Sequence, residues 1–131
     1  MTDEQTTVAQ LRIMMKEFVA ERQWEKFHTP RNLAVSAAVE AGELLELFQW
    51  LGEDESTARL GDGAFRQAVA DEMSDVLMYI LSLANRLDID LSAAAEAKMT
   101  RNRVKYPVEK FRGHYARPIE NRPPVDRANQ D

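Results

Sequence analysis

The sequence predicts an all-α protein, with an antiparallel four-helix bundle-like protomer. Apolar residues recur at helical spacing over four stretches of the chain, and no stretch shows strand-like alternation. The chain has 131 residues, of which 44% are hydrophobic and 30% charged, as in an ordinary globular domain with one core. It has no cysteine, which excludes a disulfide framework, a thiolate zinc site and a cysteine nucleophile.

The first two helices have clear sequence signals. Residues 7–22 place Val8, Leu11, Phe18 and Val19 at helical spacing. Thr29 and Pro30 are a helix start, with threonine as N-cap and proline at the first helical position. We expect this second helix to run from Pro30 to about Leu51.

A polar linker, residues 52–63, separates these helices from two more. A third helix is expected from about Ala64 to Leu87, and a fourth from Asp90 or Ser92 to about Tyr106, ended by Pro107. Residues 1–112 then form one domain. The proline- and charge-rich residues 113–131 are predicted to be a tail, disordered or draped over a partner.

The net charge and the N-terminal residues limit which partners and which location are expected for the protein. The N-terminus is polar and acidic, so we expect no secretory signal, and no apolar run approaches the length of a membrane span. The net charge of −5 argues against nucleic-acid binding. A cytoplasmic protein without a membrane or nucleic-acid partner is the expectation. The four broad apolar faces also predict assembly with a partner subunit.

Two acidic pairs, Glu40 with Glu43 and Glu72 with Asp75, stand out in the second and third helices. The members of each pair are three residues apart and share a helix face. Ionised carboxylates on a half-buried face are unfavourable unless a metal or basic side chains pair with them. Either a metal or basic side chains could be the partner of these carboxylates, and we favour a metal. The two stripes also hold Leu33, Ser36, Leu47 and Trp50, and Phe65, Ala68, Val76 and Tyr79.

The donor atoms narrow the choice of metal. The pairs offer only oxygen, which favours Mg²⁺, Mn²⁺ or Ca²⁺ over Zn²⁺. His28 and His114 stand in no Glu-x-x-His motif, so a ferritin-like di-iron site is rejected. Mg²⁺ readily shares its shell with phosphates, so we expect Mg²⁺ bridging to a polyphosphate, with Mn²⁺ as a substitute. Glu46 and Asp71 lie off the two stripes and are expected to be peripheral.

Other residues suit a nucleotide pocket. Lys98, Asn102 and Lys105 share one stripe of the fourth helix, within a basic segment, and could hold phosphate, sugar or base. Aromatic rings at helical spacing are more often core than ligand contacts, and a lone loop histidine is more often a structural hydrogen bonder. The candidates for stacking on or contacting a base are Trp24, Trp50, Tyr79 and His28.

Several motifs together resemble a known family over residues 8–112. They are Trp24-x-x-Phe27-His28-x-Pro30-Arg31-Asn32-Leu33, Glu40-x-x-Glu43 through Leu47-Phe48-Gln49-Trp50, Glu72-x-x-Asp75 with Tyr79, and Lys98-x-x-x-Asn102-Arg103-x-x-Tyr106-Pro107. This set resembles the MazG-like nucleotide pyrophosphohydrolases of the all-α NTP pyrophosphatase superfamily, and most closely their dCTP pyrophosphatase branch.

The resemblance implies a Mg²⁺-dependent enzyme that hydrolyses a (deoxy)nucleoside triphosphate to a monophosphate and pyrophosphate. The expected substrate is dCTP or a modified pyrimidine dNTP, and the expected assembly is a homodimer or homotetramer. The alternatives are the same chemistry on a broader nucleotide set, and a non-catalytic helical dimerisation module. By resemblance, Glu40, Glu43, Glu72 and Asp75 hold Mg²⁺, and Trp24, His28, Trp50, Tyr79, Lys98 and Asn102 line the substrate pocket.

Overall fold

The computed structural model describes residues 1–113, which contain helices, turns and no strand. The prediction of an all-α fold is confirmed. The helices are α1 (Val8–Glu21), α2 (Pro30–Glu46), α3 (Glu53–Arg59), α4 (Gly63–Leu87), α5 (Leu91–Lys105) and α6 (Val108–Phe111).

Local signals set the start of α1. The Thr7 hydroxyl accepts a hydrogen bond from the Gln10 backbone N–H at 3.2 Å, and the Gln10 side chain accepts one from the Thr7 backbone N–H at 2.7 Å. This capping box satisfies two N–H groups that the first turn leaves without helical partners. The helix buries Met15 and Val19, which are one turn apart.

The second helix starts where the sequence predicts and ends earlier. The Thr29 hydroxyl accepts from the Asn32 backbone N–H at 3.2 Å, with Pro30 at the first position. The helix ends at Glu46, so the expected end at Leu51 is wrong. Residues 47–50 form turns, in which the Leu51 N–H donates to the Phe48 carbonyl at 3.0 Å. These tight bonds redirect the chain toward α3, so Trp50 is not on α2.

The predicted linker contains a helix, α3, and its interpretation as a plain loop is also wrong. Three acidic residues occupy the first turn of α3 and Arg59 the last, an arrangement that complements the helix dipole. The Ser56 and Thr57 hydroxyls both donate to the Glu53 carbonyl. A stretch that looks merely polar is therefore a short helix stabilised at its ends.

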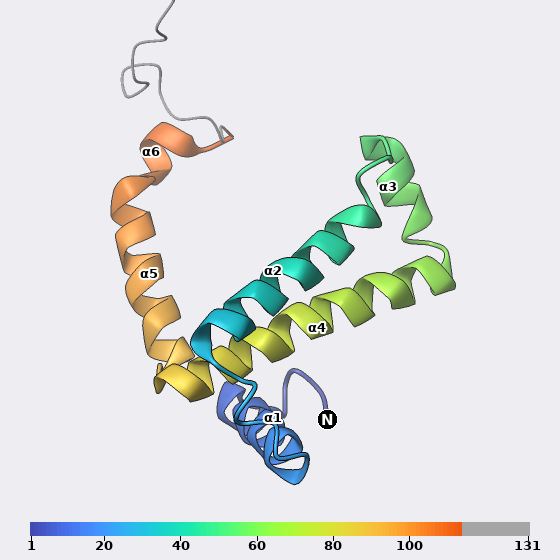
Figure 1. The fold of residues 1–131 in the computed structure, drawn as a ribbon. Coiled ribbons are helices and arrows are strands. Elements are labelled where there is room, and N and C mark those ends of the chain that lie inside the picture. The colour runs from blue at the N-terminus through green and yellow to red at the C-terminus, as the bar shows by residue number, and fades with distance from the viewer. Residues whose placement is uncertain (114–131) are drawn as a thin grey trace, which may run out of the picture. The chain divides into compact units, whose positions relative to one another are not determined.

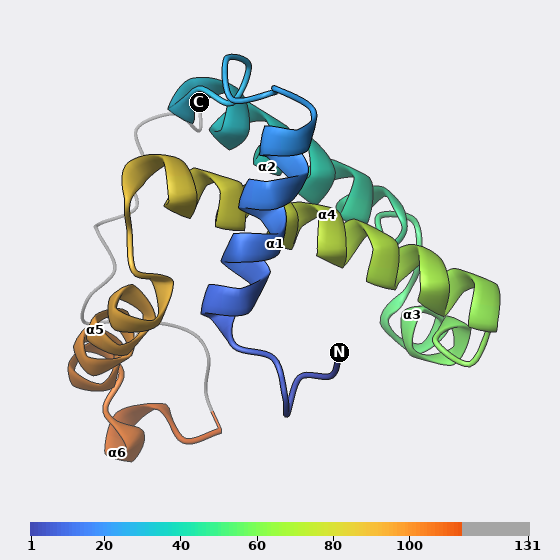
Figure 2. The same cartoon turned by 90° about the horizontal axis from the view of Figure 1, so that it is seen from below.

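Residues 1–92 form one compact unit, built on α4. In this unit α2 and α4 lie side by side and run in opposite directions, joined through α3 (Figure 1). The first helix, α1, crosses the C-terminal half of α4 (Figure 2). The buried apolar residues come from all three helices: Met15, Val19, Leu33, Phe65, Leu81 and Ala84.

Polar contacts fix α1 to α4, and a left-handed residue ends α4. The Arg12 Nε donates to Asn85 Oδ1 at 2.9 Å, and Asn85 Nδ2 donates to the Arg12 carbonyl at 2.8 Å. Asp88 has φ of 52° and donates its N–H to the Ala84 carbonyl, which terminates the helix.

A second unit begins at Ala93 and is described by itself. It carries most of α5 and the short α6, where the Tyr106 and Phe111 rings meet edge to face at 5.2 Å. Beyond Gly113, the tail expected at 113–131 lies outside the described residues. Within the described part of the chain, no helix is long and apolar enough to cross a membrane.

Candidate metal and ligand site

Three of the four predicted carboxylates meet between α2 and α4. Glu40, Glu43 and Glu72 each offer a carboxylate oxygen, and these oxygens all lie within 4.8 Å of one another. The antiparallel packing brings together residues that are about thirty positions apart in the chain. This is a possible acidic metal-binding cluster, since oxygen donors at such spacing suit a hard cation. Asp75 lies near enough for its charge to act on both Glu40 and Glu72.

The cluster has no positive partner among residues 1–113. The ion pair in this part of the chain is between Arg22 and Glu21, far from the acidic pairs in sequence. Glu72 Oε2 has less than 1 Å² of accessible surface and no hydrogen-bond partner in the part of the chain that the structure describes. A buried, charged oxygen without a partner is unfavourable. The described residues therefore supply no salt-bridge network for these acids, and the donor set fits a divalent cation.

The surroundings of the acidic cluster raise the pKa values of Glu40 and Glu72. Partial burial, followed by the charges of Glu43, Asp75 and Glu72, raises the pKa of Glu40. Partial burial and then Glu43 and Asp75, with smaller contributions from Asp71 and Glu46, raise the pKa of Glu72. In both cases the charged form is disfavoured in the folded protein. A bound cation would reverse this effect.

These shifts predict that the metal-free protein gains stability on mild acidification. A carboxylate with a raised pKa takes up its proton in the folded state before the unfolded chain does, so the free energy of unfolding rises as pH falls through the folded-state pKa. In EDTA, the melting temperature should be higher at pH 5.5 than at pH 7 for the wild type. We expect a smaller gain for Glu72→Gln, and saturating Mg²⁺ should raise the wild-type value at pH 7. Equal pH profiles for the two proteins in EDTA would contradict this electrostatic account.

A cavity of about 260 Å³ holds three of the predicted pocket residues. Trp24, His28 and Tyr79 line it together with Asp75 of the second acidic pair. A neighbouring cavity of about 390 Å³ also includes His28 and Tyr79, with Arg31 and Asn32. Asp75 thus connects the acidic cluster with a partly aromatic cavity. The remaining lining of the smaller cavity is Met15, Phe18, Met78 and Ser82.

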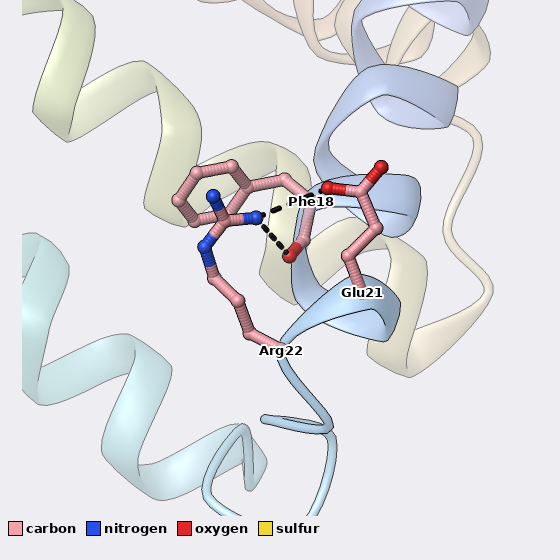
Figure 3. A network of polar contacts seen from close by, with 3 residues as sticks. All are labelled: Phe18, Glu21 and Arg22. Carbon is pink, nitrogen blue, oxygen red and sulfur yellow. Dashed lines mark hydrogen bonds and ion pairs between the residues drawn. The ribbon is translucent and has the colours of Figure 1, made fainter.

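Arg22 supports the aromatic side of this cavity. Its guanidinium lies 3.7 Å from the centre of the Phe18 ring and donates to the Phe18 carbonyl at 3.0 Å and to Glu21 at 3.2 Å (Figure 3). The Phe18 and Trp24 rings meet edge to face, with centroids 5.9 Å apart. These contacts order Phe18 and Trp24, although both side chains are partly exposed.

The other predicted pocket residues lie elsewhere in the chain. Trp50 is 86% exposed and lines neither of these two cavities. Lys98 and Asn102 lie one turn apart on α5, in the second unit, and their part in the site stays a prediction.

Sequence reasoning missed four residues of the smaller cavity. Met15 and Phe18 lie on the first helix, where the sequence predicts Phe18 only as part of an apolar stripe. Ser82 had a usable signal, because Asp75, Tyr79 and Ser82 follow an i, i+4, i+7 pattern on one helix face. A serine at that position of an apolar helix face needs a hydrogen-bond partner for its hydroxyl.

The fold and the site define an all-α protein in which two packed helices bring three glutamates together, Glu40 and Glu43 from α2 and Glu72 from α4. The chain belongs to the MazG-like family, whose model matches residues 35–116, more than half of the sequence.

Curated relatives agree with this assignment. The chain is 45% identical to dCTP pyrophosphatase 1 of Rattus norvegicus over 107 residues, which cover 82% of this chain and 63% of the relative. The human dCTP pyrophosphatase 1 is 45% identical over 101 residues, or 77% of this chain and 59% of the relative. The chain therefore spans less than two thirds of the length of these relatives. They confirm the resemblance to the dCTP pyrophosphatase branch.

A solved structure supports the fold. The chain matches a pyrophosphatase from Archaeoglobus fulgidus with a TM-score of 0.73 and 38% sequence identity, over 82% of this chain and 98% of that one.

Proposed function

We propose that the protein is a Mg²⁺-dependent pyrophosphohydrolase of nucleoside triphosphates, acting on dCTP or a modified pyrimidine dNTP. One observation carries the proposal: an unpaired carboxylate cluster adjoins a partly aromatic cavity, and Asp75 connects them. A ligand that combines a metal-bound polyphosphate with a flat ring matches both the carboxylate cluster and the partly aromatic cavity. The relatives bearing the name dCTP pyrophosphatase 1 and the archaeal pyrophosphatase support the same reaction class.

The acidic residues would hold the metal. Glu40, Glu43, Glu72 and Asp75 supply the oxygen ligands, and Mn²⁺ is a plausible substitute with the same preference. When bound, Mg²⁺ would supply charge neutralisation and polarisation of the phosphate oxygens. The orphaned Glu72 Oε2 and the raised pKa values of Glu40 and Glu72 support this assignment, because a bound cation would partner the buried oxygen and stabilise the charged form of both carboxylates.

The reaction itself requires a water and a base. The water oxygen forms a bond to one of the two phosphorus atoms of the α–β linkage, and the bond from that phosphorus to the bridging oxygen breaks. The bridging oxygen stays with the departing product, and a carboxylate accepts the water proton. Glu43 is our candidate for the base, since it is the exposed member of the cluster. The products are a nucleoside monophosphate and pyrophosphate.

The cavity would bind the nucleoside. Trp24 and Tyr79 offer flat rings for stacking, and His28 offers a hydrogen-bonding group beside them. Lys98 and Asn102 remain candidates for phosphate, sugar or base contacts, and Trp50 for a further ring contact. Nucleic acid and membranes are not expected partners.

A second copy of the chain is the proposed partner, in a homodimer or in a homotetramer. Large apolar side chains on α2 and α4 are exposed in the single chain, which is unfavourable in water. Burial against a second copy would complete a bundle-like arrangement. These side chains are Val35, Val39, Leu45, Met73, Leu77 and Ile80.

A turnover panel tests the proposed function. Pyrophosphate release from each canonical dNTP and NTP, and from methylated and oxidised pyrimidine triphosphates, should be measured with Mg²⁺, with Mn²⁺ and with EDTA. We expect dCTP or a modified pyrimidine dNTP to give the highest kcat/KM and EDTA to abolish turnover. Similar kcat/KM values across the panel would favour the broad-specificity alternative. If no triphosphate is hydrolysed and Mg²⁺ leaves the melting temperature unchanged, the non-catalytic dimerisation module is the correct interpretation.

A further inference from the structure

Ser82 on α4 carries a buried hydroxyl without a hydrogen-bond partner among the described residues. The residue is 6% exposed, and its Oγ has less than 1 Å² of accessible surface. A serine inside a helix can donate to the carbonyl four residues earlier, as Ser74 does to Ala70 at 2.7 Å. Ser82 makes no such bond. A buried hydroxyl left unpaired destabilises the fold, so its presence calls for a reason.

The neighbouring polar groups do not satisfy it. Asn85, one turn further along α4, exchanges two hydrogen bonds with Arg12 of α1. The same arginine also donates to the Ala84 carbonyl at 3.4 Å. These contacts use the amide of Asn85 and leave the Ser82 hydroxyl without a partner within residues 1–113.

The position of Ser82 suits contact with a ligand. It lines the 260 Å³ cavity with Trp24 and Tyr79, and also an adjoining cavity of about 320 Å³. Along one face of α4, Asp75, Tyr79 and Ser82 follow in order at i, i+4 and i+7, so a carboxylate, an aromatic ring and a hydroxyl succeed one another. Pockets for whole drug-sized ligands have volumes of roughly 300–1,000 Å³. The smaller cavity therefore suits part of a nucleotide, such as its base.

We propose that the Ser82 hydroxyl hydrogen-bonds a nitrogen or oxygen atom on the edge of the substrate base, and so contributes to substrate specificity. This inference rests on the proposed function. With the phosphates at the acidic cluster and the base against the rings, the edge of the base points onward along α4 toward Ser82. Met15 and Met78 line the same cavity, and their unbranched side chains can change rotamer to admit the base.

Ser82→Ala tests the proposal by two opposite effects. The ligand-free variant should melt a few degrees higher than the wild type, because an unpaired hydroxyl leaves the interior. Its Kd for α,β-imido-dCTP with Mg²⁺, measured by titration calorimetry, should rise about five- to tenfold. Its Kd for inorganic tripolyphosphate, which has no base, should be unchanged. In turnover, KM should rise with little change in kcat.

Ser56→Ala is the matched control, because it removes a hydroxyl that donates to the Glu53 carbonyl on α3 and lines none of these cavities. It should leave both Kd values at the wild-type level. An unchanged Kd for the analogue in Ser82→Ala overturns the proposal, and so does an equal loss of affinity for analogue and tripolyphosphate. A lower melting temperature for Ser82→Ala would mean that the hydroxyl stabilises the folded protein, and this result would also overturn the proposal. If the wild type binds neither probe, the proposed function fails together with this inference, whereas wild-type binding without an effect of Ser82→Ala refutes only the inference.

Discussion

Replacing Glu72 with glutamine is expected to reduce kcat/KM by on the order of a thousandfold while the fold is retained. The amide keeps the shape of the side chain but lacks the charge, and it places a possible N–H donor where a cation would need an oxygen. Glu72 is the strongest choice because its Oε2 is buried and unpartnered. Pyrophosphate release from dCTP with Mg²⁺ measures the loss, and calorimetry with Mg²⁺ alone should record weaker metal binding.

The neighbouring Asp71 provides the control. It precedes Glu72 on α4, is exposed, and accepts a hydrogen bond from the Gln67 amide at 2.8 Å. Asp71→Asn removes one negative charge from the same helix but none of the clustered carboxylates, and Asp71 contributes little to the pKa of Glu72, so activity should stay within a few-fold of the wild type. If Glu72→Gln retains activity within tenfold of Asp71→Asn, the cluster is not the metal site.

Leu33→Ala is expected to lower the free energy of unfolding by about 2–5 kcal/mol. Leu33 is 2% exposed and is the buried residue of α2, so its truncation leaves a cavity within the residues 1–92 core. Because α2 and α4 carry the two halves of the acidic cluster, we also expect weaker Mg²⁺ binding in the folded variant. Urea unfolding monitored by circular dichroism gives the stability change.

Leu60→Ala serves for comparison, since Leu60, which follows the last residue of α3, is 44% exposed. It should change the free energy of unfolding by less than about 1 kcal/mol. Similar losses for the two variants would mean that Leu33 is not part of the main core.

The sequence predicted the helices well where local signals were strong. Thr29 and Pro30 marked the start of α2, and the structure has the predicted cap. The end of α2 was not predictable, because residues 47–51 keep an apolar, helix-compatible composition and only the tight bonds of the turn end the helix. The helix in 53–59 was missed because a short segment without apolar periodicity gives no pattern to detect.

The candidate site was predicted to a similar extent. The one-turn spacing of each acidic pair indicated a shared face, and packing brought three of the carboxylates within 4.8 Å. The contribution of α1 was missed, because a methionine or a phenylalanine on an apolar helix face gives the same sequence pattern whether or not a cavity lies beside it. Which side chains surround a cavity depends on how helices cross, and helix crossing is not encoded in the periodicity of one helix.

The cavity and the acidic cluster share α4 but otherwise draw on different parts of the chain. The clustered glutamates lie on α2 and α4, whereas the cavity walls come from α1, the segment around Trp24 and His28, and residues 75–82 of α4. On the proposed function, substitutions in the walls would change which base is accepted and leave the catalytic chemistry intact. Under that function the scaffold would be adaptable: a lineage, or a protein engineer, could redirect it toward a new damaged or modified nucleotide through the cavity walls on α1, the segment around Trp24 and His28, and α4 beyond Asp75, without altering the clustered glutamates.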